Sequence, residues 1–189
     1  MAEKILAGVD EVGRGSLAGP VVSCALILKK NINRKFLRDS KTIQFKDRIE
    51  IAEYIKKNSW YAIGSASVNE IDKYNIFNAT LLSMERAVKK LKKKPHLVLV
   101  DGTHAPKKLK NSRTVIKGDQ KIKCISAASI VAKVHRDLYM IKLGNKFPQY
   151  KWHKNFGYGT WQHLGALKKF GVTDYHRKSY RPVHNILSK

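Results

Sequence analysis

The chain has 189 residues and a mass of 21.5 kDa, long enough for one domain with its own hydrophobic core. Lysine and arginine number 38 against 14 for aspartate and glutamate, so the formal net charge is +24. This charge indicates a polyanionic partner, either a nucleic acid or an anionic membrane surface, although the base composition of the genome is an alternative source of the scattered lysines. The 43% hydrophobic content excludes a disordered basic tail.

The cysteines and the N-terminal residues exclude several other classes. Cys24 and Cys124 each lie in an apolar run, so we expect buried, inert thiols. No CxxC pair or zinc-finger spacing occurs in the chain. Because neither a signal peptide nor a membrane-spanning run is present, we expect a cytoplasmic protein that does not enter a membrane.

The elements predicted for the first half of the chain begin with strands. Short apolar runs predict strands, and apolar residues at helical spacing predict helices. Asn69 is the expected cap of a short turn ahead of the second helix. In chain order we expect a strand over 5–10, a strand over 21–28, a helix over 45–57, a strand over 60–68 and a helix over 77–91.

The second half of the chain alternates strands with helices. We expect strands over 96–100 and 113–116, a helix over 124–142, and a last helix capped by Thr160 and ended by Gly171. No internal repeat and no Gly-, Ser- or Pro-rich linker divides the chain. The order predicts an α/β fold with one mixed sheet flanked by helices, in which functional sites gather where strands end.

Four acidic residues stand at the ends of these predicted strands. Asp10 and Asp101 end apolar runs, Glu11 follows Asp10, and Asp119 follows a possible strand through a glycine. A buried carboxylate needs a partner, which is either a lysine or a metal ion. Carboxylates held together raise one another's pKa, and a hard divalent cation removes that repulsion. Two such ions can activate a water and stabilise the leaving oxygen of a phosphodiester, but spacing alone does not decide whether the four acids converge.

The other acids have ordinary explanations. Asp137 lies four residues after Lys133, so we expect an ion pair on a helix surface. Solvated helix faces or positions near helix caps are expected for Asp47, Glu50, Glu53, Glu70, Asp72 and Glu85.

Two glycine-containing segments are candidates for nucleic-acid contacts. Gly13-Arg14-Gly15 lets a substrate backbone approach closely and offers peptide N–H groups to phosphate or hydroxyl oxygens, although a tight turn between strands is the alternative. Tyr158, between two glycines, could stack on a sugar or base, and a core tyrosine is the alternative. The polar loop that contains Lys41 could reach a phosphate.

The histidines of the C-terminal part do not show a metal-binding spacing. We expect them at the surface or facing a nucleic acid rather than as zinc ligands. They are His153, His163, His176 and His184.

Taken together and in order, these motifs resemble bacterial ribonuclease HII. Each motif is weak alone, but the ordered set is specific and covers nearly the whole chain. It comprises DEVGRG at 10–15, LAGPV at 17–21, DSK at 39–41, NI at 75–76 with AT at 79–80, VDG at 100–102, KGD at 117–119, SAASIVAK at 126–133 and GYGT at 157–160.

The resemblance implies an RNase H-like fold with a five-stranded mixed sheet flanked by helices. It implies a single catalytic domain over 1–189, in which about 145–189 form a helical, substrate-binding C-terminal extension, and we expect a monomer. The implied activity is hydrolysis of the RNA strand in RNA–DNA hybrids and incision 5′ to single ribonucleotides embedded in duplex DNA. The products would carry 3′-hydroxyl and 5′-phosphate ends.

The resemblance also assigns roles to residues. It makes four acids the catalytic, metal-binding carboxylates for Mn²⁺ or Mg²⁺, with two ions in the catalytic complex: Asp10, Glu11, Asp101 and Asp119. It places Gly13, Arg14 and Gly15 around the ribose 2′-hydroxyl and its neighbouring phosphates. Tyr158 would assist recognition at the RNA-to-DNA junction, and Lys41 would contact a phosphate.

Two other functions remain open from the sequence. A non-catalytic, basic nucleic-acid-binding protein would explain the charge, but acids near its binding surface would weaken phosphate binding unless a metal neutralised them. Ribonuclease HIII is a related enzyme that usually carries an additional N-terminal domain, whereas here the catalytic motif begins at once. The Gly-Arg-Gly turn and Tyr158 also favour ribonuclease HII.

Overall fold

A computed structural model describes residues 4–30, 32 and 44–188. Within these residues one mixed sheet has the strand order β3-β2-β1-β4-β5. The central strand β1 runs antiparallel to β2 and parallel to β4. The strands are β1 (Leu6–Val12), β2 (Val21–Leu28), β3 (Ser59–Ala66), β4 (Leu97–Asp101) and β5 (Ser112–Val115).

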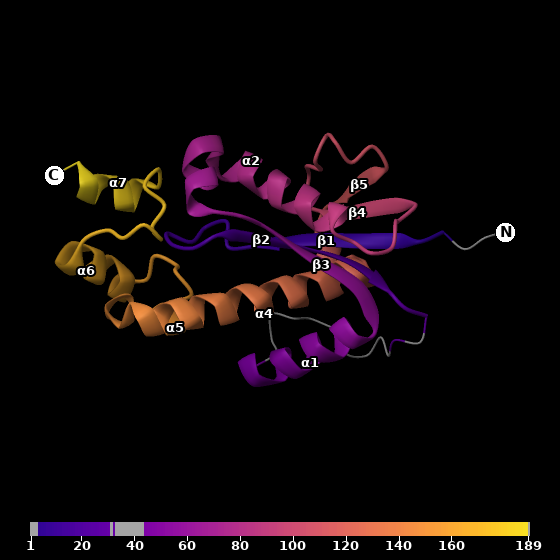
Figure 1. The fold of residues 1–189 in the computed structure, drawn as a ribbon, viewed down its shortest axis with the longest axis horizontal. Coiled ribbons are helices and arrows are strands. Elements are labelled where there is room, and N and C mark those ends of the chain that lie inside the picture. The colour runs from indigo at the N-terminus through magenta and orange to yellow at the C-terminus, as the bar shows by residue number, and fades with distance from the viewer. Residues whose placement is uncertain (1–3, 31, 33–43, 189) are drawn as a thin grey trace.

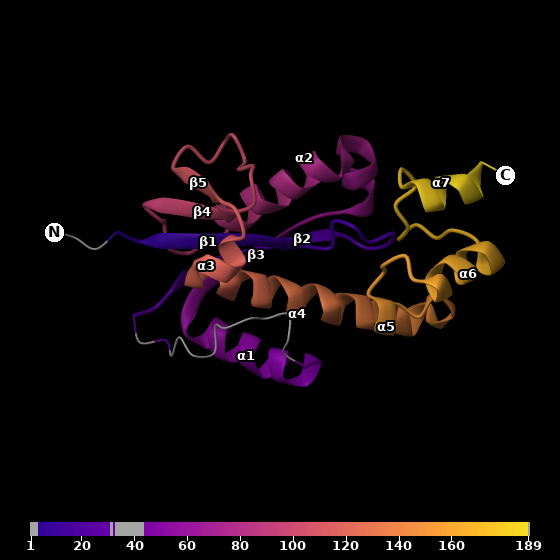
Figure 2. The same ribbon diagram turned by 180° about the vertical axis from the view of Figure 1, so that it is seen from behind.

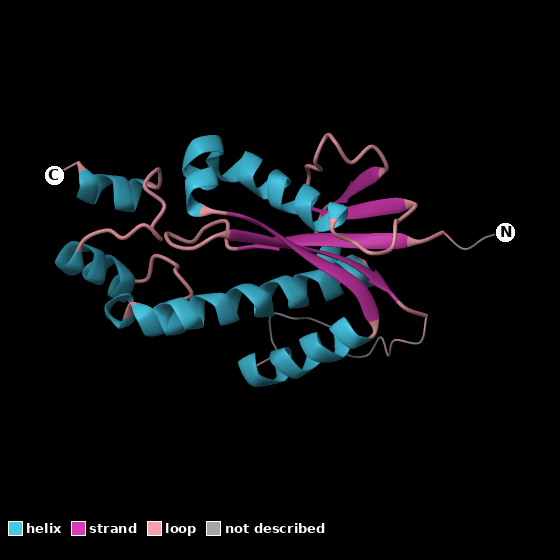
Figure 3. Ribbon diagram, in the orientation of Figure 1, coloured by secondary structure: helices cyan, strands magenta, loops and turns pink. Residues whose placement is uncertain are grey.

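Helices cover both faces of the sheet. Figure 1 shows α2 on one face and α4 with α1 on the other, and the reverse view in Figure 2 shows the same layers. The helices are α1 (Phe45–Lys57), α2 (Val68–Lys89), α3 (Gly118–Lys121), α4 (Lys123–Lys146), α5 (Trp152–Asn155), α6 (Trp161–Phe170) and α7 (Arg181–Leu187), with a 3₁₀ turn at Pro148–Tyr150. The predicted α/β fold, with a five-stranded mixed sheet between helices, is therefore confirmed (Figure 3).

Alternating side chains on the strands build the core on both faces of the sheet. Val9 and Val100 pack with Met84 of α2 on one face, while Cys24 of β2 packs with Ile130 of α4 on the other.

The start of α4 lies directly against β1. A Cβ atom on Gly8 would stand 2.2 Å from the Cys124 carbonyl carbon, so only glycine permits this approach. The contact brings the first turns of α4 beside the strand that carries Asp10.

Most predicted boundaries agree with the structure to within a few residues. The strand over 21–28 and the helix over 45–57 have the predicted ends. β1 continues to Val12, two residues beyond the predicted end at Asp10, so Glu11 also lies within the strand.

The start of α2 differs from the prediction. Ser67 caps the helix: its Oγ accepts a hydrogen bond from the Glu70 N–H at 3.3 Å, and the Glu70 carboxylate accepts one from the Ser67 N–H at 2.9 Å. Asn69 is therefore not the cap. The helix also contains a kink at Asn75, which has a φ of 64°, so the predicted start at residue 77 corresponds to the segment after the kink.

The C-terminal part is helical, as expected, and packs around its own cluster of aromatic and aliphatic side chains. Tyr150, Trp152, Leu167 and Val183 are buried together with Met140 near the end of α4. Figure 1 shows α6 and α7 at the end of the molecule opposite the N-terminus. No helix in the described parts of the chain is long and apolar enough to span a membrane. The division into one domain with an extension from about residue 145 stays a prediction.

Candidate active site

The candidate site lies where β1 and β4 end side by side. Asp10 and Glu11 are close to the end of β1, and Asp101 is the last residue of β4. Val9 pairs with Val100 in the parallel ladder, so Asp10 and Asp101, the next residue on each strand, reach the same level of the sheet. Adjacent carboxyl ends of parallel strands are where an α/β sheet usually builds its site.

The fourth acid, Asp119, lies on the short helix α3. Asp101 Oδ1 accepts hydrogen bonds from the N–H groups of Gly118 at 2.6 Å and Asp119 at 3.4 Å. These bonds satisfy backbone donors at the start of α3. They also fix the backbone of Asp119 against the Asp101 carboxylate, while the Asp119 residue itself is half-buried.

Asp10 has the largest pKa shift among the acids of the site. It is 6% exposed, and burial raises its pKa to about 8, with the negative charges of Glu11 and Asp101 acting in the same direction. A hydrogen bond with Ser129 and one from the Glu11 N–H, at 2.7 Å, oppose the shift. Asp10, Glu11 and Asp101 therefore interact electrostatically.

Glu11 connects this acid site to the neighbouring turn. Burial raises the pKa of Glu11, and the charge of Arg14 opposes that shift. Arg14 Nη1 lies 3.3 Å from Glu11 Oε1. Glu11, Arg14 and Asp101 line a hollow of about 330 Å³, and Thr80 and His104 also belong to its lining.

The chemistry of these donors fits a hard divalent cation. Carboxylate oxygens are the ligands that Mg²⁺ and Mn²⁺ prefer, and a cation would offset the repulsion that raises the pKa of Asp10. The present side-chain positions do not form a closed cage, because no three His, Cys, Asp or Glu side chains in the described residues lie together so as to hold a metal ion.

The Gly13-Arg14-Gly15 turn lies next to Tyr158. A Cβ atom on Gly15 would stand 4.0 Å from Tyr158 Cε1, although the two residues are far apart in the sequence. Gly13 has a φ of +91°, and its own Cβ would stand 2.1 Å from Arg136 Nε, so this position requires glycine. The turn thus has a structural role, and its residues Arg14 and Gly15 are exposed.

Tyr158 is a surface residue with a fixed backbone rather than a core tyrosine. It is 37% exposed. Its carbonyl lies 2.9 Å from His163 Nδ1, and the guanidinium of Arg136 lies 5.8 Å from its ring centroid. Lys41, the remaining predicted contact, lies outside the described residues together with Asp39 and Ser40.

The prediction for the histidines is wrong at two positions. His163 and His176 are fully buried, and their Nε2 atoms lie 3.1 Å apart. Trp152 Nε1 donates a hydrogen bond to His163 Nε2 at 3.0 Å, and His176 Nδ1 accepts one from the Thr173 N–H at 3.0 Å. The polar atoms are thus satisfied inside an aromatic cluster, and no metal-binding group includes them among the described residues.

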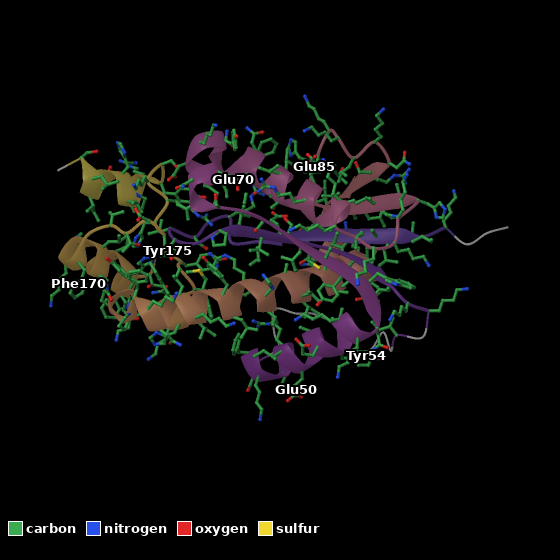
Figure 4. The ribbon with its side chains drawn as sticks, in the orientation of Figure 1. Glu50, Tyr54, Glu70, Glu85, Phe170 and Tyr175 are labelled. Atoms are coloured by element: carbon green, nitrogen blue, oxygen red, sulfur yellow. The ribbon has the colours of Figure 1, made fainter. Side chains whose placement is uncertain are left out.

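Two acids expected at helix surfaces are buried. The ion pair between Asp137 and Lys133 is confirmed at 2.7 Å, but Asp137 is fully buried. Glu85 is also buried, where it pairs with Lys89. Figure 4 shows Glu70 and Glu85 on α2, across the sheet from Glu50 on α1. Both cysteines are buried and free, as expected, and burial raises the pKa of Cys124 to about 11.

Three further residues hold this region together, and neither motif nor spacing marked them in the sequence. Arg136 and Arg177 are fully buried and donate to backbone carbonyls of the segment 13–20. Asp72 accepts hydrogen bonds from the N–H groups of Lys178 and Ser179, both at 3.0 Å, and so anchors the C-terminal segment. Each contact joins residues more than 100 positions apart, which explains why local patterns do not reveal it.

The mixed five-stranded sheet, with acids at neighbouring strand ends, has the fold of the ribonuclease H class. The structure is similar to the ribonuclease H2 from Pyrococcus horikoshii OT3, with a TM-score of 0.82 and 24% identity over 97% of each chain. It is also similar to Bst-RNase HIII in complex with Mn²⁺, with a TM-score of 0.71 and 14% identity, over 98% of this chain and 70% of that one. At these identities the likeness shows the fold alone.

Sequence comparison identifies the family. The family model for ribonuclease HII matches residues 7–183. Ribonuclease HII of Pelagibacter ubique (strain HTCC1062) is 58% identical over 186 residues, which cover 97% of this chain and 100% of the relative. The chain belongs to the ribonuclease HII family, whose members are divalent-metal-dependent enzymes that cleave the RNA of RNA–DNA hybrids.

Proposed function

We propose that this enzyme, besides cleaving RNA in hybrids, incises 5′ to single ribonucleotides embedded in duplex DNA and leaves 3′-hydroxyl and 5′-phosphate ends. The observation that carries the proposal is the continuity between the acids and the Gly-Arg-Gly turn. Arg14 contacts Glu11 on one side, and Gly15 abuts Tyr158 on the other. Hydrolysis and recognition of one ribose therefore take place on adjoining parts of one surface.

Four carboxylates are the proposed metal ligands: Asp10, Glu11, Asp101 and Asp119. When Mn²⁺ or Mg²⁺ is bound, as two ions in the catalytic complex, the metal supplies activation of the attacking water and stabilisation of the leaving oxygen. Among the described residues no three of these acids lie together so as to hold an ion, so we expect their carboxylates to move closer together when a metal binds. The hydrogen bonds from the N–H groups of Gly118 and Asp119 would keep the Asp101 carboxylate oriented.

Recognition of the ribose falls to the turn and to Tyr158. The peptide N–H groups of Gly13, Arg14 and Gly15 would donate to the 2′-hydroxyl region and its neighbouring phosphates. A site built to pair a hydroxyl disfavours a substrate without one, which explains discrimination against DNA. Tyr158 would contact the sugar or base at the RNA-to-DNA junction, and Lys41 would contact a phosphate.

The proposal extends to the partner and the setting of the reaction. We expect the enzyme to act on nucleic acid as a cytoplasmic monomer, without entering a membrane. The C-terminal part from about residue 145 to 189 would bind the duplex, since it carries Tyr158 and basic residues such as Lys168 and Lys169 at the end of α6. The net charge of +24 supports binding to phosphates.

The test is an incision assay on an end-labelled DNA duplex that contains one ribonucleotide. We expect one nick 5′ to the ribonucleotide with Mn²⁺ or Mg²⁺, no nick in EDTA, and no nick in an all-DNA duplex. Asp101→Asn should abolish the nick, whereas Glu53→Gln, which removes one charge from a side chain 53% exposed on α1, should not. An enzyme that cleaves hybrids but leaves the single ribonucleotide uncut would refute the incision proposal.

A further inference from the structure

Arg177 is a buried arginine whose hydrogen-bond partners are mainly backbone carbonyls. Its Nη2 donates to the Gly13 carbonyl at 2.6 Å, and its Nη1 donates to the Arg14 carbonyl at 2.8 Å. Nε and Nη2 also donate to the Gly19 carbonyl at 3.0 and 2.9 Å. Tyr180 completes the group, because its hydroxyl accepts from Arg177 and donates to the Arg14 carbonyl.

This arrangement is unusual for a buried charge. Arg177 is fully buried, and the ion pairs of the described residues do not include one between Arg177 and a carboxylate. A buried guanidinium is costly unless its donors are satisfied. Here the carbonyls satisfy them, and only the planar fork of arginine can reach three carbonyls at once, which a lysine ammonium cannot reproduce.

The carbonyls that Arg177 holds determine where the following N–H groups point. In a planar trans peptide, the C=O of one residue and the N–H of the next point in opposite directions. Since the Gly13 and Arg14 carbonyls face Arg177, the N–H groups of Arg14 and Gly15 face away from it. Both residues are exposed, and within the described residues neither N–H donates a backbone hydrogen bond.

We propose that Arg177 is a positioning residue that orients the N–H groups of Arg14 and Gly15 toward the ribose and its adjacent phosphate. The inference rests on the proposed function and adds the residue that orients the Gly-Arg-Gly turn for it. Two consecutive free N–H groups on one side of a turn form an anion-binding concavity. Arg177 holds that concavity open from inside the protein without touching the substrate.

Arg86 provides a control that lies away from the turn. Its Nη1 donates to the Ser65 carbonyl at 2.8 Å and to Glu70 Oε2 at 2.9 Å, and its Nη2 donates to Glu70 Oε1 at 2.6 Å. None of these acceptors belongs to the peptide units of Arg14 or Gly15. Arg86→Lys therefore removes an arginine fork without releasing the two N–H groups.

The experiment compares Arg177→Lys with Arg86→Lys in an Asp10→Asn parent, which keeps the duplex uncut. The dissociation constants for a duplex with one ribonucleotide and for the same duplex in all-DNA form are measured by fluorescence anisotropy. We expect the preference for the ribonucleotide to fall about tenfold in Arg177→Lys, the loss expected from misdirected hydrogen bonds. Affinity for the all-DNA duplex should remain, and Arg86→Lys should keep the preference.

Amide hydrogen exchange of the wild-type protein gives a second test that needs no variant. The N–H groups of Arg14 and Gly15 should exchange rapidly in the free protein, become protected by the ribonucleotide duplex, and remain unprotected with the all-DNA duplex. Slow exchange in the free protein would overturn the inference. If Arg177→Lys does not fold, Tyr180→Phe takes its place and should reduce the same preference by a smaller factor.

The outcomes separate the inference from the function on which it rests. A parent protein with no preference for the ribonucleotide would overturn both. A parent that has the preference, together with an Arg177→Lys variant that retains it, would overturn the role of Arg177 alone and leave the proposed incision intact.

Discussion

The ring of Tyr158 lies against the backbone of Gly15, such that a methyl group on Gly15 would stand 4.0 Å from Tyr158 Cε1. Gly15 belongs to the turn after β1, and Tyr158 precedes α6. The contact therefore connects the turn after β1, the strand that carries Asp10 and Glu11, with the helical C-terminal part. A nucleic acid that reaches the acids would meet both the turn and the tyrosine.

We predict that Gly15→Ala folds normally but cleaves poorly. The added methyl meets only Tyr158, at an ordinary contact distance, so the melting temperature should stay near that of the wild type. The methyl occupies the space through which the ribose approaches, so kcat/KM for the single-ribonucleotide duplex should fall about tenfold or more. Gly165→Ala is the control, since a Cβ there meets nothing within 4 Å. Unchanged kcat/KM in Gly15→Ala would contradict the placement of the ribose.

Gly13→Ala should instead damage the fold. Its φ of +91° disfavours any side chain, and the new Cβ would stand 2.1 Å from Arg136 Nε. We expect a loss of about 2–3 kcal/mol in the free energy of unfolding, measured by urea denaturation. A Gly13→Ala protein as stable as Gly15→Ala would show that Arg136 does not hold the turn as described.

Removing the charge of Asp10 should stabilise the metal-free protein. Burial and the neighbouring carboxylates raise the pKa of Asp10 to about 8, so above that pH the folded state carries a buried charge that costs stability. At pH 8.5 in EDTA, Asp10→Asn should be more stable than the wild type by about 1 kcal/mol or more, yet should gain less stability from added Mn²⁺. Asp174→Asn, at an exposed residue, should change neither the stability in EDTA nor the stability gained from Mn²⁺. Lower stability of Asp10→Asn in EDTA would argue against electrostatic repulsion at the site.

The buried histidine pair predicts sensitivity to acid. Burial and the proximity of His163 lower the pKa of His176 to about 3, and burial lowers the pKa of His163. The unfolded chain therefore binds protons below about pH 6.5 that the folded chain does not, so stability is fully present above that pH and is lost as the pH falls toward 3. Trp152 donates to His163, so its fluorescence should report the loss during urea unfolding between pH 7.5 and 4.5.

Two variants check this assignment. His176→Gln should lower stability at pH 7.5 and flatten its dependence on pH, because one of the two titrating groups is gone. His184→Gln, at an exposed residue of α7, should leave the dependence unchanged. An identical pH dependence in the wild type and in His176→Gln would contradict the role of the pair.

Local sequence patterns predicted the strands that carry Asp10 and Asp101, but not the short helix α3 that carries Asp119. Spacing did not predict that the acids converge, because it is the parallel pairing of Val9 with Val100 that brings Asp10 and Asp101 together. Hydrophobic periodicity identifies such strands because burial determines it directly. The start of α2 was missed because the Ser67–Glu70 capping box, not Asn69, begins the helix.

What the sequence could not predict depends on contacts between distant residues. His163 and His176 resemble surface histidines of a basic tail, and only the packing of Tyr150 and Trp152 around them makes them core residues. Similarly, Arg177 becomes significant only because the fold brings it to the carbonyls of Gly13 and Arg14. Neither periodicity nor motif spacing encodes tertiary hydrogen bonds of this kind.

The central claim is that four carboxylates hold the catalytic metal: Asp10, Glu11, Asp101 and Asp119. The most direct measurement is an anomalous difference map from crystals soaked in Mn²⁺. We predict metal peaks between the ends of β1 and β4 and the start of α3, coordinated by these carboxylates, and no such peaks in Asp10→Asn crystals. Peaks elsewhere, or peaks that persist unchanged in Asp10→Asn, would contradict the claim.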